Sequence, residues 1–430
     1  MSFKRGPIAA LAVATIMGGM IVSPAIAKKK PKEEEATSFT LSAPFRALAA
    51  QAQASIAAGN STAAAGQVAE LKRTAVAPSE KYVAGQLALQ YAAWRGDMQG
   101  QRLALSAILD SNAAPAAETP RLRYLAGYLS NMLGEQGDAI AQVNYARQLG
   151  YVNRDSAMLL ADATLRKTKG ADGMQFADEA AKLDRQAGRA EPASWYDRAG
   201  ALAYQGGKWG DVARWYQEKL SLYPTAPNWR SAIVNYLAAP GIDPQAQLDL
   251  YRLMSATGAL ASERDFQAYA TAAAARGFDG EARAAIEAGR SSANLTATDP
   301  ATAKLFSTVS PKAVKAAAAL PAQAKKAQSA SNGAAAMAAG DLYFSLAQYP
   351  QAAYLYHTAI SKGGIDDART RTRLGVALAR SGDLPGAKTA LSQVPAGPWS
   401  TVAGFWSVWV DLQIKRNATA QGIAATPPAS

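Results

Sequence analysis

The sequence of 430 residues contains no cysteine and a single histidine, His357. The absence of cysteine excludes disulfides, thiolate nucleophiles, cysteine-ligated zinc and iron–sulfur clusters. One imidazole leaves at most one centre for histidine-dependent nucleophilic catalysis and excludes a metal site with several histidine ligands. Aromatic residues make up only 8% of the chain, and alanine dominates its apolar residues. This composition favours an all-α fold of closely packed helices over a sheet core of bulky side chains.

Patterns that would carry a cofactor or an acid–base pair are also scarce. The glycine-rich run 206–210 lacks the Lys-Ser/Thr ending of a phosphate loop and lies where a turn between helices is expected. His357 follows a residue of the buried type, and we expect it at the surface or at a packing edge. Asp366 and Asp367 begin a predicted helix, where acidic side chains favour the positive end of the helix dipole. We therefore expect no catalytic residue, no metal and no cofactor.

The N-terminus has the pattern of a secretory signal peptide. Lys4 and Arg5 precede an apolar run over residues 8–22, and a helix-breaking proline leads to an A-x-A site that ends at Ala27. The alternative is an uncleaved membrane anchor, because residues 7–26 approach the length of a spanning helix. No second apolar run of that length occurs. We expect cleavage after Ala27, a periplasmic or secreted protein, and no stable membrane span after cleavage.

The charge of the chain is strongly positive, at +12 with a pI near 9.6. An exported protein with this charge meets lipid phosphates, anionic glycans and acidic proteins rather than nucleic acid. The charges are dispersed, since the lysines at 28–30 are followed by glutamates at 33–35. No basic stripe interleaved with aromatic residues is present, and we therefore expect no nucleic-acid partner.

A repeated pattern of helix, short break and helix organises the chain. In one unit Gly375 is followed twelve residues on by Ala387 and sixteen on by Leu391, with a Gly382-Asp383 turn between. Small residues at such positions let two antiparallel helices approach closely, and glycine ends the first helix. The marker positions of the repeat are Gly127, Asp162, Gly200, Ile233, Ala270, Gly340 and Gly375. They fall about 33 to 38 residues apart, except for one gap of 70 residues that predicts a degenerate unit.

This period and its small residues resemble the tetratricopeptide repeat family, and inserted turns such as 240–244 also resemble related helical repeats with longer units. The resemblance implies a right-handed superhelical solenoid of about ten antiparallel helix pairs, whose first helices line a concave groove for extended peptides or partner helices. Asp162 departs from the pattern, because it stands where a small packing residue is expected. Carried over residue by residue, the resemblance implies a partner-binding groove of Arg121, Tyr124, Tyr128, Asn131, Asp197, Tyr204, Arg230, Arg264, Gln267 and Arg369.

The expected domain organisation follows from the repeats. We predict a signal peptide at 1–27, a disordered charged segment at 28–38, a helical array at 39–290, a degenerate repeat or hinge at 291–332, C-terminal repeats at 333–415 and a disordered tail at 416–430. Within the C-terminal repeats, residues 399–414 form a final helix that caps the last apolar face. Aromatic residues that recur at helical spacing, such as Trp215 and Trp406, are expected as core or cap contacts rather than glycan-stacking surfaces.

Three functional hypotheses follow from this sequence. The first is a non-enzymatic periplasmic scaffold or adaptor that joins other envelope proteins or their peptide segments in an assembly or export complex. A second is an exported glycan-binding module, with groove tyrosines and arginines on an anionic chain in polysaccharide synthesis or secretion. The third is a cell-wall enzyme related to helical lytic transglycosylases, which carry a separate catalytic domain. Because the repeats run to Pro398 with only one helix after them, the sequence favours the scaffold.

Overall fold

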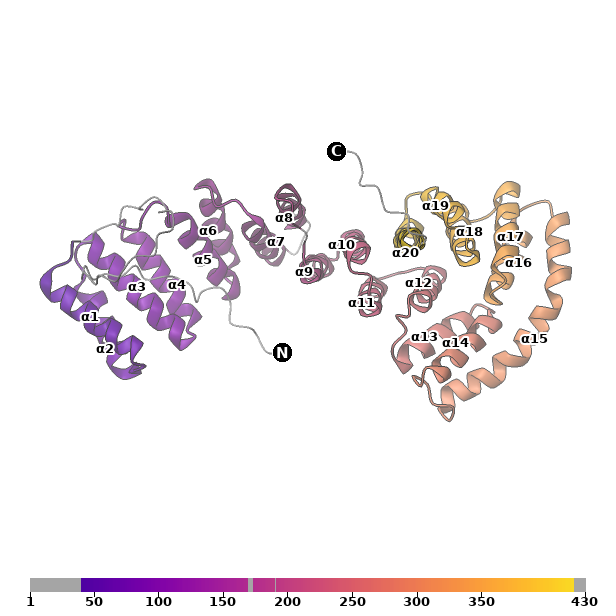
Figure 1. The fold of residues 1–430 in the computed structure, drawn as a ribbon, viewed down its shortest axis with the longest axis horizontal. Coiled ribbons are helices and arrows are strands. Elements are labelled where there is room, and N and C mark those ends of the chain that lie inside the picture. The colour runs from indigo at the N-terminus through magenta and orange to yellow at the C-terminus, as the bar shows by residue number, and fades with distance from the viewer. Residues whose placement is uncertain (1–39, 169–172, 190, 421–430) are drawn as a thin grey trace. The chain divides into compact units, whose positions relative to one another are not determined.

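The computed structural model describes residues 40–168, 173–189 and 191–420. The predicted signal peptide, the predicted disordered segment 28–38 and the last part of the predicted tail lie outside these residues. Within them the chain forms 20 α-helices and no strand (Figure 1). Consecutive helices pack as antiparallel pairs, so the fold is an all-α repeat of the helical-solenoid type, as the sequence predicts.

The chain divides into two compact units, Met1–Glu191 (unit 1) and Pro192–Ser430 (unit 2), and the division falls inside the segment 39–290 that the sequence predicts as one array. Unit 1 contains the helices α1 (Ala43–Ala57), α2 (Ser61–Thr74), α3 (Pro78–Arg95), α4 (Met98–Asp110), α5 (Thr119–Met132), α6 (Gln136–Gln148), α7 (Arg154–Thr168) and α8 (Met174–Gln186).

Unit 2 contains the remaining helices, α9 (Ala193–Gln205), α10 (Trp209–Leu222), α11 (Ala226–Leu237), α12 (Pro244–Ala256), α13 (Glu263–Ala274), α14 (Asp279–Ser291), α15 (Pro300–Ser329), α16 (Ala334–Ser345), α17 (Tyr349–Lys362), α18 (Asp367–Ser381), α19 (Leu384–Ser392) and α20 (Pro398–Ala420). Residues 206–208 of the run 206–210 form the turn from α9 into α10, and residues 240–243 of the inserted segment lie in the turn from α11 into α12. Trp209, Gly210 and Pro244 already belong to the helices that follow.

Short capping sequences set the starts of several helices. The side chain of Asp97 accepts a hydrogen bond of 2.8 Å from the Gly100 amide at the start of α4. Asp383 repeats this contact at the start of α19, with a bond of 2.9 Å from the Gly386 amide. Asp366 caps α18 in the same way, which confirms that the two acidic residues 366–367 begin a helix. Each cap satisfies an amide that the first turn of a helix leaves without a partner.

The small marker residues lie where the two helices of a pair are closest. A Cβ atom at Gly127 on α5 would lie only 2.6 Å from Cγ2 of Val143 and 3.0 Å from the carbonyl oxygen of Ala139 on α6. A Cβ atom at Gly375 on α18 would lie 2.5 Å from Cγ of Leu391 on α19. The partners are the residues twelve and sixteen positions on, so the predicted spacing is confirmed.

This close approach predicts a large cost for a single methyl group at Gly127. Gly127→Ala is expected to lower the free energy of unfolding by about 1–3 kcal/mol, because the backbone of α6 must move away. Gly137→Ala on α6 is the matched control, since open space surrounds that glycine, and it is expected to leave stability unchanged or slightly raised. Chemical denaturation followed by circular dichroism measures both changes. Equal effects of the two substitutions would contradict the packing described here.

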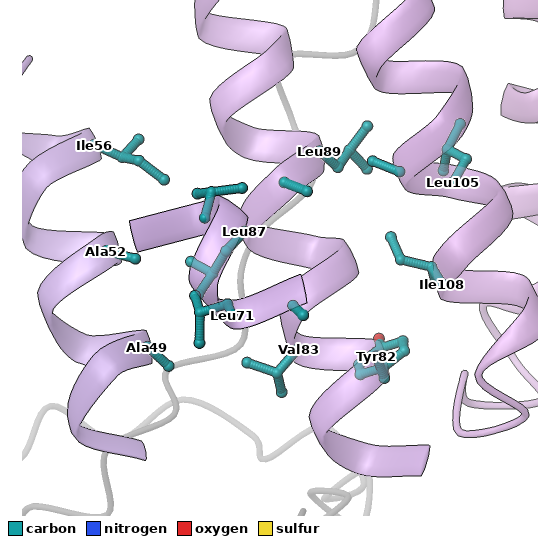
Figure 2. Packing of buried hydrophobic residues seen from close by; sticks show 14 of the residues in the cluster. Ala49, Ala52, Ile56, Leu71, Tyr82, Val83, Leu87, Leu89, Leu105 and Ile108 are labelled. Carbon is teal, nitrogen blue, oxygen red and sulfur yellow. The ribbon is translucent and has the colours of Figure 1, made fainter. Parts of the chain in front are cut away.

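The core of unit 1 is a continuous layer of apolar side chains between successive helices. Figure 2 shows Ala52 and Ile56 of α1 pointing toward Leu71 and Leu87, which come from α2 and α3. The same cluster continues through Leu105 and other residues of α4 into α5. Each helix pair therefore buries its apolar face against the next pair, which is how repeat arrays obtain a core.

The segment predicted as a degenerate repeat or hinge is neither a helix pair nor a flexible connection, because α15 is one helix of 30 residues. No glycine occurs between Gly289 and Gly333, so no residue of this alanine-rich segment supplies the left-handed position that commonly ends a helix. Pro311 and Pro321 lie inside the helix, and each removes one backbone hydrogen bond without ending it. At its C-terminal end, Lys362 donates hydrogen bonds of 2.6 to 3.1 Å to three carbonyl oxygens of the helix end.

Helix α20 caps the last pair, as predicted, and also packs against α10, α12 and α18. The Trp406 indole donates a hydrogen bond of 3.2 Å to the main-chain oxygen of Asp249 on α12, and the Gln217 amide on α10 donates one of 3.2 Å to that of Thr401. The last helix of unit 2 therefore packs against helices near the start of the same unit. The tail predicted to begin at residue 416 is helical as far as Ala420, since no glycine or proline interrupts α20 after Gly404.

None of the helices in the described part of the chain combines the length and the apolar character that a spanning segment needs.

Candidate partner-binding surface

Polar side-chain contacts join neighbouring helix pairs in both units. Asn131 on α5 donates a hydrogen bond of 2.6 Å to Asp162 on α7, 31 residues later. Arg102 on α4 forms an ion pair of 2.5 Å with Asp138 on α6, 36 residues later. Separations of 31 and 36 residues are close to one repeat period, so these contacts hold one repeat to the next. The first contact also explains why Asp162 stands where the repeat pattern expects a small packing residue. Its carboxylate accepts the hydrogen bond from Asn131.

In unit 1 three of the predicted groove residues share one face of α5. Arg121, Tyr124 and Tyr128 have the i, i+3, i+7 spacing that places side chains on one face. Arg121 is exposed, whereas the two tyrosines are half-buried and pack against apolar residues of neighbouring helices. The ring of Tyr124 lies 4.9 Å from that of Tyr151, which precedes α7. We call the surface of Arg121, Tyr124 and Tyr128 the α5 surface. Neighbouring helices pack against the inner sides of its tyrosines, and its outer side is accessible to solvent.

The fourth predicted groove residue of unit 1 lies deeper. Asn131 is 3% exposed and bonds to Asp162 through its amide nitrogen, so it belongs to the contact between repeats rather than to the α5 surface. Its buried Oδ1 atom has no hydrogen-bond partner among the described residues.

In unit 2 most predicted groove residues are engaged by neighbouring side chains. Asp197 forms an ion pair of 2.6 Å with Lys219 on the second helix of its pair. Arg230 on α11 holds Asp265 on α13 with two hydrogen bonds of 2.8 and 3.0 Å. Although burial opposes it, the bond from Arg230 helps to hold the pKa of the Asp265 carboxyl below its ordinary value. These residues act first as links within and between repeats.

The other predicted groove residues of unit 2 lie at separate places. Tyr204 is 43% exposed and contacts Trp209 edge-on, with ring centroids 5.0 Å apart. Gln267 donates a hydrogen bond of 2.7 Å to Glu263, and Arg264 is exposed on the same helix.

Arg369 lines a cleft of about 470 Å³ between α16 and the start of α18. Its guanidinium lies 3.4 Å from the sulfur of Met337 and 4.0 Å from the carboxylate of Asp366. The structure thus brings together the residues of α5 but does not bring the predicted groove residues of unit 2 into one surface.

Sequence analysis missed a cluster of buried charges at the centre of unit 2. Arg252 pairs with Asp249 at 2.5 Å and with Glu281 at 2.6 Å, and its side chain is 3% exposed. Arg373 pairs with Asp249 at 3.1 Å and with Asp341 at 2.8 Å and is fully buried. Burial alone would lower the pKa of Arg373, but the two carboxylates outweigh it and raise that pKa.

The sequence does contain a signal for part of this cluster. Arg373 stands two residues before Gly375, and Asp341 stands one residue after Gly340, so charges of opposite sign lie one repeat apart beside packing glycines. A cavity of about 250 Å³ adjoins the cluster, with Arg252, Glu281, Tyr269 and Trp406 in its wall. The Tyr269 hydroxyl donates a hydrogen bond of 2.7 Å to Glu281, so the polar groups at this cavity are occupied by one another.

Two further features bear on acid–base chemistry, a buried pair of carboxylates and the single histidine. Glu191 is buried beside Asp184, and burial followed by that neighbour raises its pKa to about 7. Arg154 lies 3.3 Å from Asp184 and 3.7 Å from Glu191, so this pair joins the start of α7 to the end of α8. We assign a structural role to these two carboxylates. His357 is exposed on α17, and no cluster of potential metal ligands occurs among the described residues.

Comparison with known proteins gives only distant structural alignments. No family model matches the sequence, and no curated protein matches it. Among solved structures, it aligns with the APC/C hetero-tetramer Cut9-Hcn1 at 12% identity and a TM-score of 0.21, over 87% of this chain and 91% of that one.

A second alignment is with the structure of Naa15/Naa10 bound to HypK-THB, at 12% identity and a TM-score of 0.27. It covers 90% of this chain but only 64% of that one. Because TM-scores this low do not establish a close structural match, the fold assignment depends on the helix pairs and their spacing described above.

Proposed function

We propose that this protein is a non-enzymatic adaptor that binds segments of other proteins through the α5 surface of unit 1. The observation that carries the proposal is the set of Arg121, Tyr124 and Tyr128 on one face of a well-packed helix. Tyrosine and arginine are the residue types that contribute most energy at protein interfaces. A fixed helix face also loses little conformational entropy on binding, because its side chains are held from below.

The chemistry of the surface indicates the kind of partner. Arg121 offers an exposed guanidinium, which pairs well with a carboxylate. The two tyrosines offer flat apolar rings with polar tips. An extended segment with an acidic residue and an aromatic or aliphatic residue a short distance away fits this combination.

The signal-peptide pattern at residues 1–27 supports an exported protein, and we place the adaptor in the periplasm, in an assembly or export complex of the cell envelope. Enzymatic activity has no support in the described residues, because their buried carboxylates are engaged by arginines, by one another or, at Glu80, by Ser42 and main-chain amides. An anionic glycan is the other partner class that the α5 surface suits, and the test below separates it from a protein.

Capture of the partner tests this proposal. The mature chain, beginning at Lys28, is expected to recover a defined protein complex from an envelope extract. Arg121→Ala with Tyr124→Ala and Tyr128→Ala is expected to lose that complex, because the variant lacks both the charge and the rings. Arg121→Glu, at an exposed position, is expected to weaken capture at least about tenfold without changing the melting temperature.

The matched control removes a tyrosine and an arginine elsewhere on unit 1. Tyr145, which is 45% exposed on α6, and Arg73, an exposed residue of α2, are replaced by alanine. Capture is expected to survive this change. Recovery of glycan with no protein, or equal capture by both variants, would refute the adaptor proposal for the α5 surface.

A further inference from the structure

Helix α15 carries an unusual charge distribution for its length. It contains five lysines, at 304, 312, 315, 325 and 326, and no aspartate or glutamate occurs between Pro300 and Ala330. All five lysines are exposed. None of them forms an ion pair with another described residue, in contrast to most arginines of the molecule. The helix therefore presents about five uncompensated positive charges to solvent.

The lysines lie on one side of the helix. Lys304, Lys315 and Lys326 are eleven residues apart, which is close to three helical turns, so they form a row along the axis. Lys312 and Lys325 flank this row. The buried residues of α15 fall on the opposite side, where the helix packs against α14 and α16, and they are Thr302, Val309, Ala313, Leu320 and Ala327. We call the five lysines the α15 lysine face.

The row runs along most of α15, which Figure 1 shows as a gently curved helix. With a rise of about 1.5 Å per residue, Lys304 and Lys326 are separated by about 33 Å along the axis. Figure 1 shows α15 at the outer edge of unit 2, between α14 and α16, with its far side turned away from the other helices of that unit. The five ammonium groups therefore lie on a side of the helix that the described residues leave open to an approaching surface.

The residues between the lysines select the class of partner. The exposed residues between Lys304 and Lys325, apart from the lysines, are Ser307, Thr308, Pro311, Val314, Ala317, Ala318, Pro321, Ala322 and Gln323. The lysine face has no tryptophan, tyrosine or arginine to act as an anchor in a protein interface or as a stacking platform for bases. Lysine is a compact, mobile charge suited to many phosphates at once rather than to one planar carboxylate. A basic helix of this kind is typical of attachment to a charged membrane surface.

We propose that the α15 lysine face holds unit 2 against a lipid surface rich in anionic headgroups. The attachment is electrostatic and peripheral, because the apolar side of α15 is buried in the core of unit 2 and does not enter the bilayer. Polybasic segments bind anionic leaflets in proportion to their number of lysines and arginines and lose this binding when salt screens the charges. The inference uses a different unit and a different chemistry from the adaptor proposal and does not depend on it.

Flotation of the mature chain with lipid vesicles tests this proposal. Binding is expected to vesicles of equal parts phosphatidylcholine and phosphatidylglycerol at about 0.1 M salt, and to be lost at about 1 M salt. Vesicles of phosphatidylcholine alone are expected not to bind. Lys304→Gln with Lys315→Gln and Lys326→Gln is expected to weaken binding at least about tenfold, and replacement of the same three lysines by arginine is expected to preserve it.

The control separates this face from the net charge of the whole chain. Lys72→Gln with Lys81→Gln and Arg95→Gln removes an equal number of positive charges, three, from exposed positions of unit 1. Binding is expected to fall much less in this control than in the α15 variant. The proposal is overturned if the two variants lose binding equally, if the wild-type chain ignores anionic vesicles, or if it binds soluble polyglutamate but no vesicle.

Discussion

Removal of α20 is expected to lower the unfolding temperature of unit 2 sharply and to leave that of unit 1 unchanged. The helix is a structural part of unit 2 as well as a cap on the last pair, because it contacts α10, α12 and α18. Phe405 and Trp406 are 0% and 1% exposed, and the ring of Phe405 lies 5.7 Å from that of Tyr236 on α11. A chain that ends at Pro398 lacks these side chains and therefore exposes the apolar surfaces of the helices that α20 covers.

A single substitution gives the same test with less disturbance. Trp406→Ala is expected to lower the free energy of unfolding of unit 2 by about 3–5 kcal/mol, since it removes a buried indole and leaves a cavity. Thr419→Ala, at an exposed position of the same helix, is the control and is expected to change stability by less than about 0.5 kcal/mol. Calorimetry resolves the transitions of the two units.

Two results would argue against this role for α20. One is a transition of unit 2 that is unaffected by truncation after Pro398. The other is a deletion of residues 28–38 that destabilises the protein as much as the loss of α20 does.

Asp249→Ala is expected to have an effect of similar size, for an electrostatic reason. Asp249 is the one carboxylate that both buried arginines contact, at 2.5 Å to Arg252 and 3.1 Å to Arg373. Arg252 keeps Glu281 and Arg373 keeps Asp341, but the guanidinium groups that faced Asp249 stay buried and lose their acceptor, at a cost of about 3–5 kcal/mol for the two arginines together. Trp406 bonds to the main-chain oxygen of Asp249, so that contact survives the substitution.

The control for this prediction is an ion pair at the surface. Glu70 and Arg73 pair at 2.5 Å on α2, with side chains 43% and 72% exposed. Glu70→Ala is expected to change the free energy of unfolding by less than about 1 kcal/mol, because exposed pairs gain little over their hydrated state. Denaturant unfolding measures both variants, and a cost for Asp249→Ala as small as that for Glu70→Ala would show that the buried cluster does not stabilise unit 2.

The helix pairs of this protein could be predicted because their signals are local. The positions twelve and sixteen residues after Gly127 and Gly375 are the residues that each glycine contacts, and a glycine needs only its own pair for that contact. The degenerate repeat or hinge predicted at 291–332 followed from the period of the repeat, whereas residues 300–329 form the single helix α15, in which no glycine ends a first helix.

Contacts between distant helices could not be predicted in the same way. Trp406 meets Asp249 across 157 residues, and no spacing within one repeat encodes that contact. The candidate surface was predicted in part. Arg121, Tyr124 and Tyr128 lie together on α5. Asn131 and Arg230 instead hold neighbouring repeats together through Asp162 and Asp265. The sequence signal for such a contact is a carboxylate about one repeat period after an arginine or an amide.

The most direct test of the adaptor proposal is hydrogen–deuterium exchange of the mature chain with and without its captured partner. We expect the partner to slow exchange over α5 and the residues around Tyr151, because these form and support the α5 surface. Exchange over α10, α12 and α20, which hold unit 2 together, is expected to stay unchanged. Protection confined to unit 2, with α5 unaffected, would contradict the proposal that the partner binds the α5 surface.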